Sequence, residues 1–383
     1  MKHLYLTLLF STLLFSNEAE ILTNTKKEII QLKKEQIKEK EQMNKYNWVS
    51  DITANASVSK DKEDIQSQDF SLSFSQDIYR FGGISSQIEY SKHLKNYEAL
   101  SLDISTKEDV STIYTLLVDI KLNDISLKKN ILNQANTYID LIQKKSEYKA
   151  GELGISDLNE VIMTKNSLKE TEKTLELTLK KNINTLKQYT NKNYSSIPLS
   201  KLKLMSKKIF LEKASAVKSA FYDTKLNKSS LDIKKSDYLP KLSLTGKYGY
   251  KDGDSIDGDD YYNYGLAVSM PFSYTSKNDI QKSKLEYLIS KKNLQKQKDD
   301  ISLTYNEVLL SLKNYEQKIA LALNDIKLYE ELLAINKQEY EAGYKTMDDI
   351  ETLENSKKIR NLDVESYKLG VQKELINLYS KIL

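Results

Sequence analysis

The sequence offers few side chains for catalysis or metal binding. Its 383 residues include no cysteine and only two histidines, His3 and His93. The absence of cysteine excludes disulfides, thiolate metal sites and thiol catalysis. We find no nucleophile–histidine–acid set and no glycine-rich phosphate loop. We therefore expect no catalytic residue, no metal site and no cofactor.

An acidic segment at residues 251–260 contains five aspartates. It lacks the ligand spacing and the closing glutamate of an EF-hand calcium loop, so an acidic, solvated loop is the better interpretation. The whole chain has 58 basic and 54 acidic residues, a net charge of +4. Because these charges are interspersed, they do not favour a nucleic-acid partner.

A second group of polar residues follows a Tyr-x-Ala-Gly sequence that occurs twice. Tyr148–Gly151 is followed by Ile155, and Tyr340–Gly343, about 192 residues later, is followed by Met347. Glycine supplies the left-handed backbone conformation that ends a helix. Both sequences therefore predict a hinge at which a long helix reverses.

Each hinge is followed by residues that favour a helix start. Ser156 after the first hinge, and Asp348 or Asp349 after the second, are expected to cap the next helix and to favour its dipole. An ordinary turn between two helices has the same features, so the pattern alone assigns no further role to the hinges.

Long helices must position these hinges. A 3-4 spacing of apolar and aromatic residues runs from Tyr305 to Tyr340 over five heptads, which predicts a coiled-coil seam. The segment 276–342 around this seam has neither proline nor glycine and would form a helix of roughly 100 Å. Further helices are expected at residues 21–46, 85–150, 155–190, 205–237 and 347–383.

Two pairs of short alternating segments precede the long helices. Apolar residues alternate with small polar ones at residues 52–59 and 70–75, and again at residues 242–248 and 264–270. This period of two predicts either a half-buried sheet or the wall of a membrane barrel. Four strands cannot close a barrel, because the smallest membrane barrels have eight. Membrane-spanning strands would therefore require several copies of the chain.

The amino terminus predicts export. Residues 1–19 combine a short basic start, an apolar run and small polar residues, as in a secretory signal peptide. Cleavage after Ser16 or after Ala19 fits equally well.

The combined pattern resembles the TolC-like outer-membrane efflux proteins. The resemblance rests on Ser75–Gly83 before the first long helix, on Ser269–Phe272 before the second, and on the two hinges, and it covers nearly all of the mature chain. The chain departs from the family at Ser273–Ser276, where glycine is usual. It also lacks the cysteine that makes some members lipoproteins, which implies anchoring by the barrel alone.

The resemblance implies a mostly helical α+β fold with long antiparallel hairpins that form a coiled-coil barrel. Four strands of each chain would contribute to a trimeric 12-stranded outer-membrane barrel. The domains would be two structural repeats, at residues 20–196 and 197–383. The implied function is an outer-membrane duct that conducts substrates passively. Its partners would be two further copies, outer-membrane lipid, a periplasmic adaptor (membrane fusion) protein and an inner-membrane pump of the RND or ABC class.

The resemblance also implies roles at the hinges, which would lie at the periplasmic end. An ion pair of Asp157 with Lys345, and a hydrogen bond from Tyr340 to Asp157 or Ser156, would hold the mouth of the duct shut. Asp349 would form a threefold carboxylate ring. A second ring is in doubt, because Thr352 occupies the family's further acidic position and only Glu351 or Glu354 could compensate. The adaptor would dock on the hinge residues Tyr148, Gly151, Ile155, Gly343 and Met347.

A periplasmic coiled-coil scaffold without a pore is the alternative. In that case the strand pairs would be soluble caps on the helices. The strands decide between the two functions, because only the duct places them in a membrane.

Overall fold

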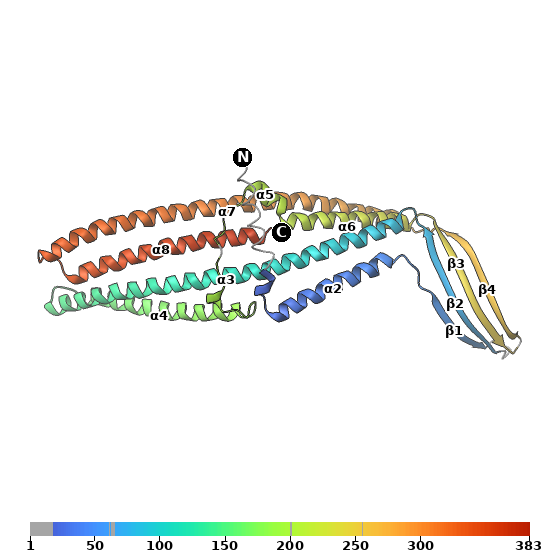
Figure 1. The fold of residues 1–383 in the computed structure, drawn as a ribbon, viewed down its shortest axis with the longest axis horizontal. Helices are drawn as coiled ribbons and strands as arrows, with labels where there is room; N and C mark the ends of the chain where they lie inside the picture. The colour runs from blue at the N-terminus through green and yellow to red at the C-terminus, as the bar shows by residue number, and fades with distance from the viewer. Residues whose placement is uncertain (1–17, 61, 63–65, 200, 255) are drawn as a thin grey trace. The chain divides into compact units, whose positions relative to one another are not determined.

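The structure of the protein is a computed structural model, and it describes residues 18–383 apart from 61, 63–65, 200 and 255 (Figure 1). Residues 1–17 of the predicted signal peptide lie outside the described residues. The chain is mostly helical and contains one four-stranded antiparallel sheet. In chain order the elements are η1 (Glu18–Ile21), α2 (Asn24–Tyr46), β1 (Thr53–Lys60), β2 (Gln66–Tyr79), α3 (Gly83–Ala150), α4 (Ile155–Leu186), η2 (Tyr194–Ser196), α5 (Lys207–Lys213), α6 (Ser215–Asp237), β3 (Lys241–Gly253), β4 (Ile256–Ser269), α7 (Ser276–Glu341) and α8 (Met347–Ser380).

The chain divides into two compact units. Unit 1 comprises residues 1–29, 104–213 and 302–383, and unit 2 comprises residues 30–103 and 214–301. The long helices α3 and α7 contribute residues to both units. The units therefore do not coincide with the two predicted repeats, residues 20–196 and 197–383, which stay a prediction.

The sheet belongs to unit 2 and has the strand order β1-β2-β3-β4. All neighbouring strands are antiparallel, including β2 and β3, which come from different strand pairs; Leu72, for example, lies opposite Tyr248. The strands have 8, 14, 13 and 14 residues. The existence of both strand pairs is thus confirmed, while β2, β3 and β4 are longer than predicted because polar residues continue the pairing.

Two different turns connect the sheet to the long helices. Between β2 and α3, Phe81 and Gly82 have positive φ angles of 44° and 84°. Between β4 and α7, the turn contains no glycine, and Ser273 stabilises it instead. Its hydroxyl accepts a hydrogen bond from the Thr275 backbone N–H (3.2 Å), and its carbonyl accepts one from the Ser276 N–H (3.3 Å). The departure from the family pattern at residues 273–276 is therefore compatible with a tight connection.

The helical part of unit 2 is held together by ion pairs and small residues. Lys95 of α3 pairs with Glu41 of α2 at 2.6 Å. Arg80, just after β2, pairs with Asp237 at the end of α6 at 2.7 Å. Close approach of α3 and α6 depends on Gly83, because a Cβ there would lie 2.2 Å from the Ser236 hydroxyl.

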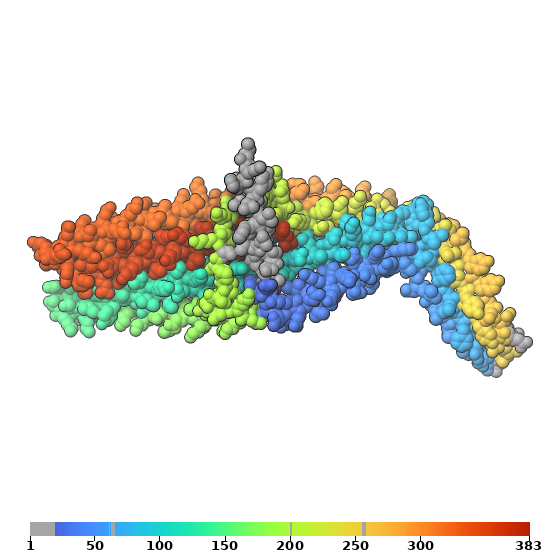
Figure 2. Space-filling model, in the orientation of Figure 1, coloured from blue at the N-terminus to red at the C-terminus, as the bar shows by residue number. Residues whose placement is uncertain are grey.

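Helices α4, α3, α8 and α7 lie next to one another in that order in unit 1 (Figures 1 and 2). Gln134 of α3 donates a hydrogen bond to Glu172 of α4 (2.9 Å). Lys373 of α8 pairs with Asp119 of α3 (2.6 Å), and Lys357 of α8 with Glu330 of α7 (3.0 Å). Each helix of this layer is therefore tied to its neighbour by at least one polar contact.

The predicted seam on α7 is confirmed. Tyr305, Val308, Ala322, Ile326 and Leu333 are buried, and the intervening seam positions are half-buried. Ala322 and Ile326 pack with Val364 of α8. Only Tyr340, at the hinge, is exposed. The pairing of α7 with α8 thus follows from spacing alone.

The apolar residues along α3 are only partly buried. Val110, Ile113 and Leu117 belong to the core, whereas Ile131 and Tyr138 are more than half exposed. Helix spacing shows which residues share a face, but it does not show where a partner ends.

The single helix predicted at residues 205–237 is wrong. It is interrupted at Ala214, whose backbone is extended (φ −57°, ψ 118°), so that α5 and α6 are separate. The Leu383 N–H donates a hydrogen bond to the Lys213 carbonyl (3.0 Å) at this break. A contact from a distant part of the chain therefore replaces a helical hydrogen bond at Ala214. The sequence gives no sign of this break, because neither proline nor glycine occurs there.

Candidate functional site

Both hinges have the same backbone geometry, and both lie at the same end of unit 1 (Figure 1). The Gly151 N–H donates to the Tyr148 carbonyl (3.1 Å), and the Glu152 N–H donates to the Glu147 carbonyl (2.9 Å). The second hinge repeats these bonds from Gly343 to Tyr340 (3.0 Å) and from Tyr344 to Glu339 (2.8 Å). This pair of bonds is the Schellman motif that ends a helix. The two predicted reversals are confirmed.

Glycine is needed at the hinges for its backbone conformation. The φ angles are +77° at Gly151 and +81° at Gly343. A Cβ at either position would meet no atom within 4 Å. The cost of a side chain here is therefore the strain of the left-handed conformation and not a steric clash.

The helix starts after the hinges differ from the prediction. The N-cap of α8 is Thr346. The prediction that Asp348 or Asp349 caps this helix is therefore wrong. The Thr346 hydroxyl accepts a hydrogen bond from the Asp349 N–H (3.3 Å) while Asp349 Oδ2 accepts one from the Thr346 N–H (2.9 Å). This reciprocal pair is a capping box. Asp349 still stabilises the helix start, although as the third helical residue.

The start of α4 has no such box. Gly154 is its N-cap and provides no side chain for capping, so Ser156 does not cap the helix as predicted. Asp157 occupies the same third position as Asp349 and lies in the first turn, where a carboxylate interacts favourably with the helix dipole. The two hinges are thus equivalent in their turns and unequal in their caps.

The capping box changes the acidity of Asp349. Hydrogen bonds from the backbone N–H and the hydroxyl of Thr346 hold the pKa of the Asp349 carboxyl below its usual range, and the charge of Lys345 adds to this effect. Asp349 therefore keeps its negative charge at mildly acidic pH.

The predicted latch residues do not pair with one another in the single chain. Among the described residues, no hydrogen bond or ion pair joins the side chains of Asp157, Ser156, Tyr340 and Lys345, although all four lie at the hinges. The exposed tyrosine Tyr340 uses its carbonyl, not its ring, in the turn. The latch and the carboxylate ring stay predictions about the assembled protein.

An ion-pair network centred on the buried Asp363, which the sequence reasoning missed, joins the two hairpins in the middle of unit 1. Asp363 of α8 is only 5% exposed. Its carboxylate accepts hydrogen bonds from Lys129 of α3 and from Arg360 of its own helix, the latter at 3.0 Å. Arg360 also pairs with Asp325 of α7 at 3.2 Å. The sequence indicates this network only through Asp363, an aspartate at a helical position that faces the core.

The sheet exposes its apolar face and buries part of its polar face, which is the reverse of a sheet in a water-soluble protein. One face carries large apolar side chains that are exposed: Phe70, Leu72, Tyr248, Tyr264 and Leu266 are 51%, 52%, 53%, 80% and 67% exposed. An apolar face of this kind in water would be a strong association or aggregation site.

The opposite face of the sheet is polar and internally bonded. Ser71 and Ser243 are buried there. The Ser243 hydroxyl donates to Asp77 (2.6 Å), and the Tyr261 hydroxyl donates to Asp69 (2.8 Å). A sheet with its apolar face outside and a bonded polar face is the arrangement of a membrane barrel wall, with lipid on one side and a polar lumen on the other.

A second apolar stripe runs along α7, away from α8. Its members are 52% to 69% exposed and are separated by steps of 7 and 11 residues: Leu303, Leu310, Leu321, Leu328 and Ile335. At 3.6 residues per turn, both steps return within about 20° of the same face. The stripe lies on the side of α7 opposite the seam. A helix that is apolar on two opposite faces packs against two partners.

Two further kinds of site, a membrane-spanning helix and a metal centre, are not found among the described residues. None of the described helices combines the length and the apolar character needed to cross a membrane. Within the same residues, no group of three or more His, Cys, Asp or Glu side chains could hold a metal ion.

Comparisons with known proteins give matches in structure alone. No protein-family model and no curated protein matches this sequence. The outer membrane channel CmeC of Campylobacter jejuni is similar with a TM-score of 0.71 and 16% sequence identity over 95% of this chain and 84% of that chain. The outer membrane protein VceC of Vibrio cholerae has a TM-score of 0.68 and 15% identity over 92% of both chains. The open state of the Neisseria gonorrhoeae MtrE outer membrane channel has a TM-score of 0.70 and 14% identity over 95% of this chain and 86% of that chain.

The chain has the fold of the outer membrane channels. At this level, the resemblance to TolC-like proteins that the hinges and strand junctions indicated is confirmed. The similarity covers 92% to 95% of the chain and thus includes helices, hinges and sheet together. At 14% to 16% identity it shows the fold, and roles for individual residues need their own evidence.

Proposed function

We propose that this protein is a passive outer-membrane duct and not an enzyme. Three copies would contribute four strands each to a 12-stranded barrel, which the helices continue as a coiled-coil tunnel in the periplasm. A periplasmic adaptor and an inner-membrane pump, of the RND or ABC class, would deliver substrates to the tunnel and supply the energy.

The observation that carries this proposal is the inverted sheet. Its apolar face is uncovered among the described residues, while its polar face is bonded. A soluble cap would bury the apolar face, because that burial is the main stabilising force of a sheet in water. Lipid would cover these apolar side chains and keep them from water without any further protein.

Two features support the association of several copies, and three is the number that the resemblance implies. The outer strands β1 and β4 each have one unpaired edge in the described chain, and an open edge in lipid leaves backbone groups unsatisfied. The second stripe of α7 needs a partner, and α4, at the opposite end of the layer, carries the exposed apolar residues Ile162, Met163 and Leu177. A ring of copies would pair the α7 stripe of one chain with α4 of the next. Three copies give twelve strands, within the range of known barrels.

The hinges are the proposed periplasmic mouth and adaptor-docking site. Two turns of identical backbone geometry present Tyr148 and Ile155 on one hairpin, and Tyr340 and Met347 on the other, and all four side chains are exposed. Asp157 and Lys345 would pair across neighbouring hairpins in the closed trimer. Exposed pairs of this kind contribute only about 0–1 kcal/mol each, which suits a gate that partner proteins open.

The proposal is tested by locating and reconstituting the full chain. We expect the protein in the outer-membrane fraction, migrating as a trimer before heating and as a monomer afterwards, with discrete conductance steps in planar bilayers. A soluble, elongated protein in the periplasmic fraction would refute the duct and favour the scaffold.

The interface between copies can be tested separately. Glutamate at both Leu321 and Leu328 places charges in the stripe, and we expect the heat-sensitive trimer band to disappear. Gln338→Glu is the matched control, because Gln338 is exposed on a different face of α7. A trimer that persists in the double variant would show that the stripe does not join the copies.

A further inference from the structure

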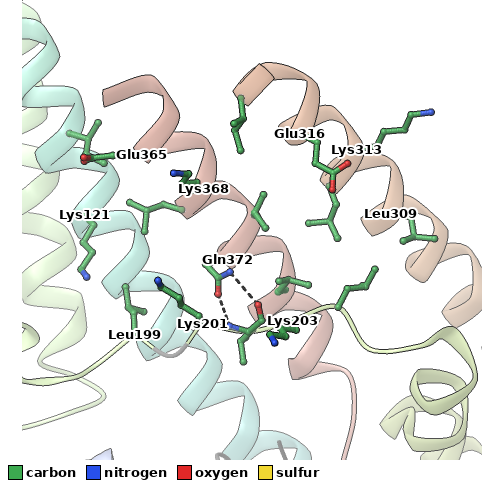
Figure 3. Close-up of a pocket in the computed structure, with 18 of the residues that line it drawn as sticks. Lys121, Leu199, Lys201, Lys203, Leu309, Lys313, Glu316, Glu365, Lys368 and Gln372 are labelled. Carbon is green, nitrogen blue, oxygen red and sulfur yellow. Dashed lines mark hydrogen bonds between the residues drawn. The ribbon is translucent and has the colours of Figure 1, made fainter. Parts of the chain in front are cut away.

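A large groove in unit 1 lies away from the hinges. It has a volume of about 1440 Å³, more than the ~300–1000 Å³ of most small-molecule sites. Its floor is α8 with α3 and α7 on either side, and residues 197–199 and 201–206, here called the strap, cross it (Figure 3). All these segments belong to one compact unit of a single chain.

The strap is fixed in place by hydrogen bonds from the helices beneath it. The Gln372 side chain accepts a hydrogen bond from the Leu202 N–H (2.8 Å) and donates one to the Leu202 carbonyl (3.3 Å). The hydroxyls of Tyr379 and Tyr305 donate to the carbonyls of Lys203 (3.0 Å) and Met205 (2.7 Å). The groove is therefore preformed, and these groups of the strap are not available to pair with a peptide strand.

The lining of the groove is aliphatic. Its apolar side chains are leucine, isoleucine and valine, among them Leu199, Leu202, Leu309, Leu312 and Leu369, and none of the lining residues is aromatic. An aliphatic surface beneath a fixed strap suits a flexible hydrocarbon chain.

The charges of the groove are unbalanced. Five of its lysines have no carboxylate within 4.0 Å in the described part of the chain: Lys121, Lys201, Lys203, Lys313 and Lys368. The unpaired acids that line the groove are Glu316 and Glu365, since Asp124 pairs with Lys128 at 2.8 Å. Lys129, Lys357 and Lys373 of the same helices have acidic partners. The groove thus combines an excess of unpaired cations with an aliphatic lining.

The lysines are not equivalent. In Figure 3 the amines of Lys121 and Lys201 lie on the α3 side of α8, as does the carboxylate of Glu365, whereas the amine of Lys313 points away from α8. One end of the groove therefore has an excess of positive charge, and its floor continues as aliphatic surface towards Leu309 and Leu312 of α7.

We propose that this groove binds a long-chain carboxylate, with its acid group at Lys121, Lys201 and Lys368 and its hydrocarbon chain beside the strap along α8. The uneven charge supplies the attraction for an anion, and the aliphatic floor supplies the contact for the chain. A peptide fits less well, because it would need backbone partners that the strap has already used. The site is independent of the duct proposal, since it is formed within one chain.

A photoreactive fatty acid tests the site directly. The full chain in phosphatidylcholine nanodiscs is labelled with a 16-carbon diazirine fatty acid, and mass spectrometry maps the labelled peptides. We expect labelling concentrated in the strap and in residues 369–375. Glutamine at Lys121, Lys201 and Lys368 should reduce it about ten-fold. Glutamine at Lys169, Lys180 and Lys181, which have no acidic partner among the described residues of α4, is the control and should leave labelling within two-fold.

Several outcomes would overturn the proposal. Three labelling results would show that the lysines do not select a carboxylate. These are labelling spread over the whole chain, equal labelling of the two triple variants, and competition by hexadecanol as strong as competition by palmitate. Amine cross-links from Lys121 or Lys201 to a second copy would show that a neighbouring chain covers the groove. Protection of these lysines from acetylation by an acidic peptide, but not by palmitate, would show a protein partner instead.

Discussion

Replacing Asp363 by asparagine tests whether buried ion pairs hold the two helical hairpins of unit 1 together. The carboxylate is almost fully buried and accepts hydrogen bonds from Lys129 of α3 and Arg360 of α8. Asparagine keeps the shape and one oxygen but removes the charge. The variant therefore probes the electrostatic part of the contact without creating a cavity.

The expected magnitude follows from what each partner retains. A hydrogen bond to a charged group contributes about 1.5–3 kcal/mol. Arg360 keeps its contact with Asp325 at 3.2 Å, so the main loss is the bond to Lys129. The Lys129 side chain is 31% exposed, so water compensates part of this loss. We expect the free energy of unfolding to fall by about 2 kcal/mol, roughly a 30-fold change in the equilibrium constant.

Denaturant unfolding of the full chain, followed by circular dichroism at the helical band, measures this change. Lys173→Gln is the control, because its pair with Glu176 at 3.2 Å involves a lysine side chain that is 72% exposed. Exposed pairs of this kind contribute at most about 1 kcal/mol and often nothing. A double-mutant cycle of Asp363→Asn with Lys129→Gln should give a coupling of about 1.5 kcal/mol. A coupling near zero, or an Asp363 variant no less stable than the control, would refute the reasoning.

Three further predictions concern the hinges. Gly343→Ala and Gly151→Ala should each lower stability by about 1–2 kcal/mol, because alanine must adopt a positive φ; thermal unfolding measures this, and an unchanged melting temperature would contradict it. The pKa of Asp349 is lowered in the folded chain, so its stabilising effect is complete above its unfolded pKa of about 4 and is lost as the pH falls through the lower folded value. The melting temperatures of the wild type and Asp349→Asn should accordingly differ most at neutral pH and converge in acid; a constant difference would exclude this linkage. Alanine at both Asp157 and Lys345 should raise single-channel conductance in a planar bilayer, and unchanged conductance would dismiss the latch.

The fold could be predicted where local rules decide it. The seam on α7 follows from its 3-4 spacing, and the two helix reversals follow from Gly151 and Gly343, which adopt the left-handed conformation that glycine favours. The strand pairs follow from period-two alternation. In each of these cases, a few neighbouring residues determine the local structure.

Features that depend on distant contacts were not predicted. The break at Ala214 depends on the backbone of Leu383. The cap of α8 is local and was missed for another reason, since Thr346 and the aspartates after it are equally good candidates by type. The ion pair of Lys129 with Asp363 joins residues 234 positions apart. The strap has no periodic pattern, so neither its course nor the groove beneath it could be read from the sequence.

The unequal lengths of the outer strands have a consequence for the order of assembly. β1 has 8 residues and β4 has 14. In the proposed trimer, the junction of one chain's β4 with the next chain's β1 can therefore be no longer than the described β1, whereas the ladder between β2 and β3 joins 12 residue pairs. The ladder between β1 and β2 also joins only 8 residue pairs, so both neighbours of β1 are held by short ladders, and the barrel should open first beside β1 when it is heated. Assembly intermediates of this protein would then be barrels open beside β1, with strands β2 to β4 of each chain already paired.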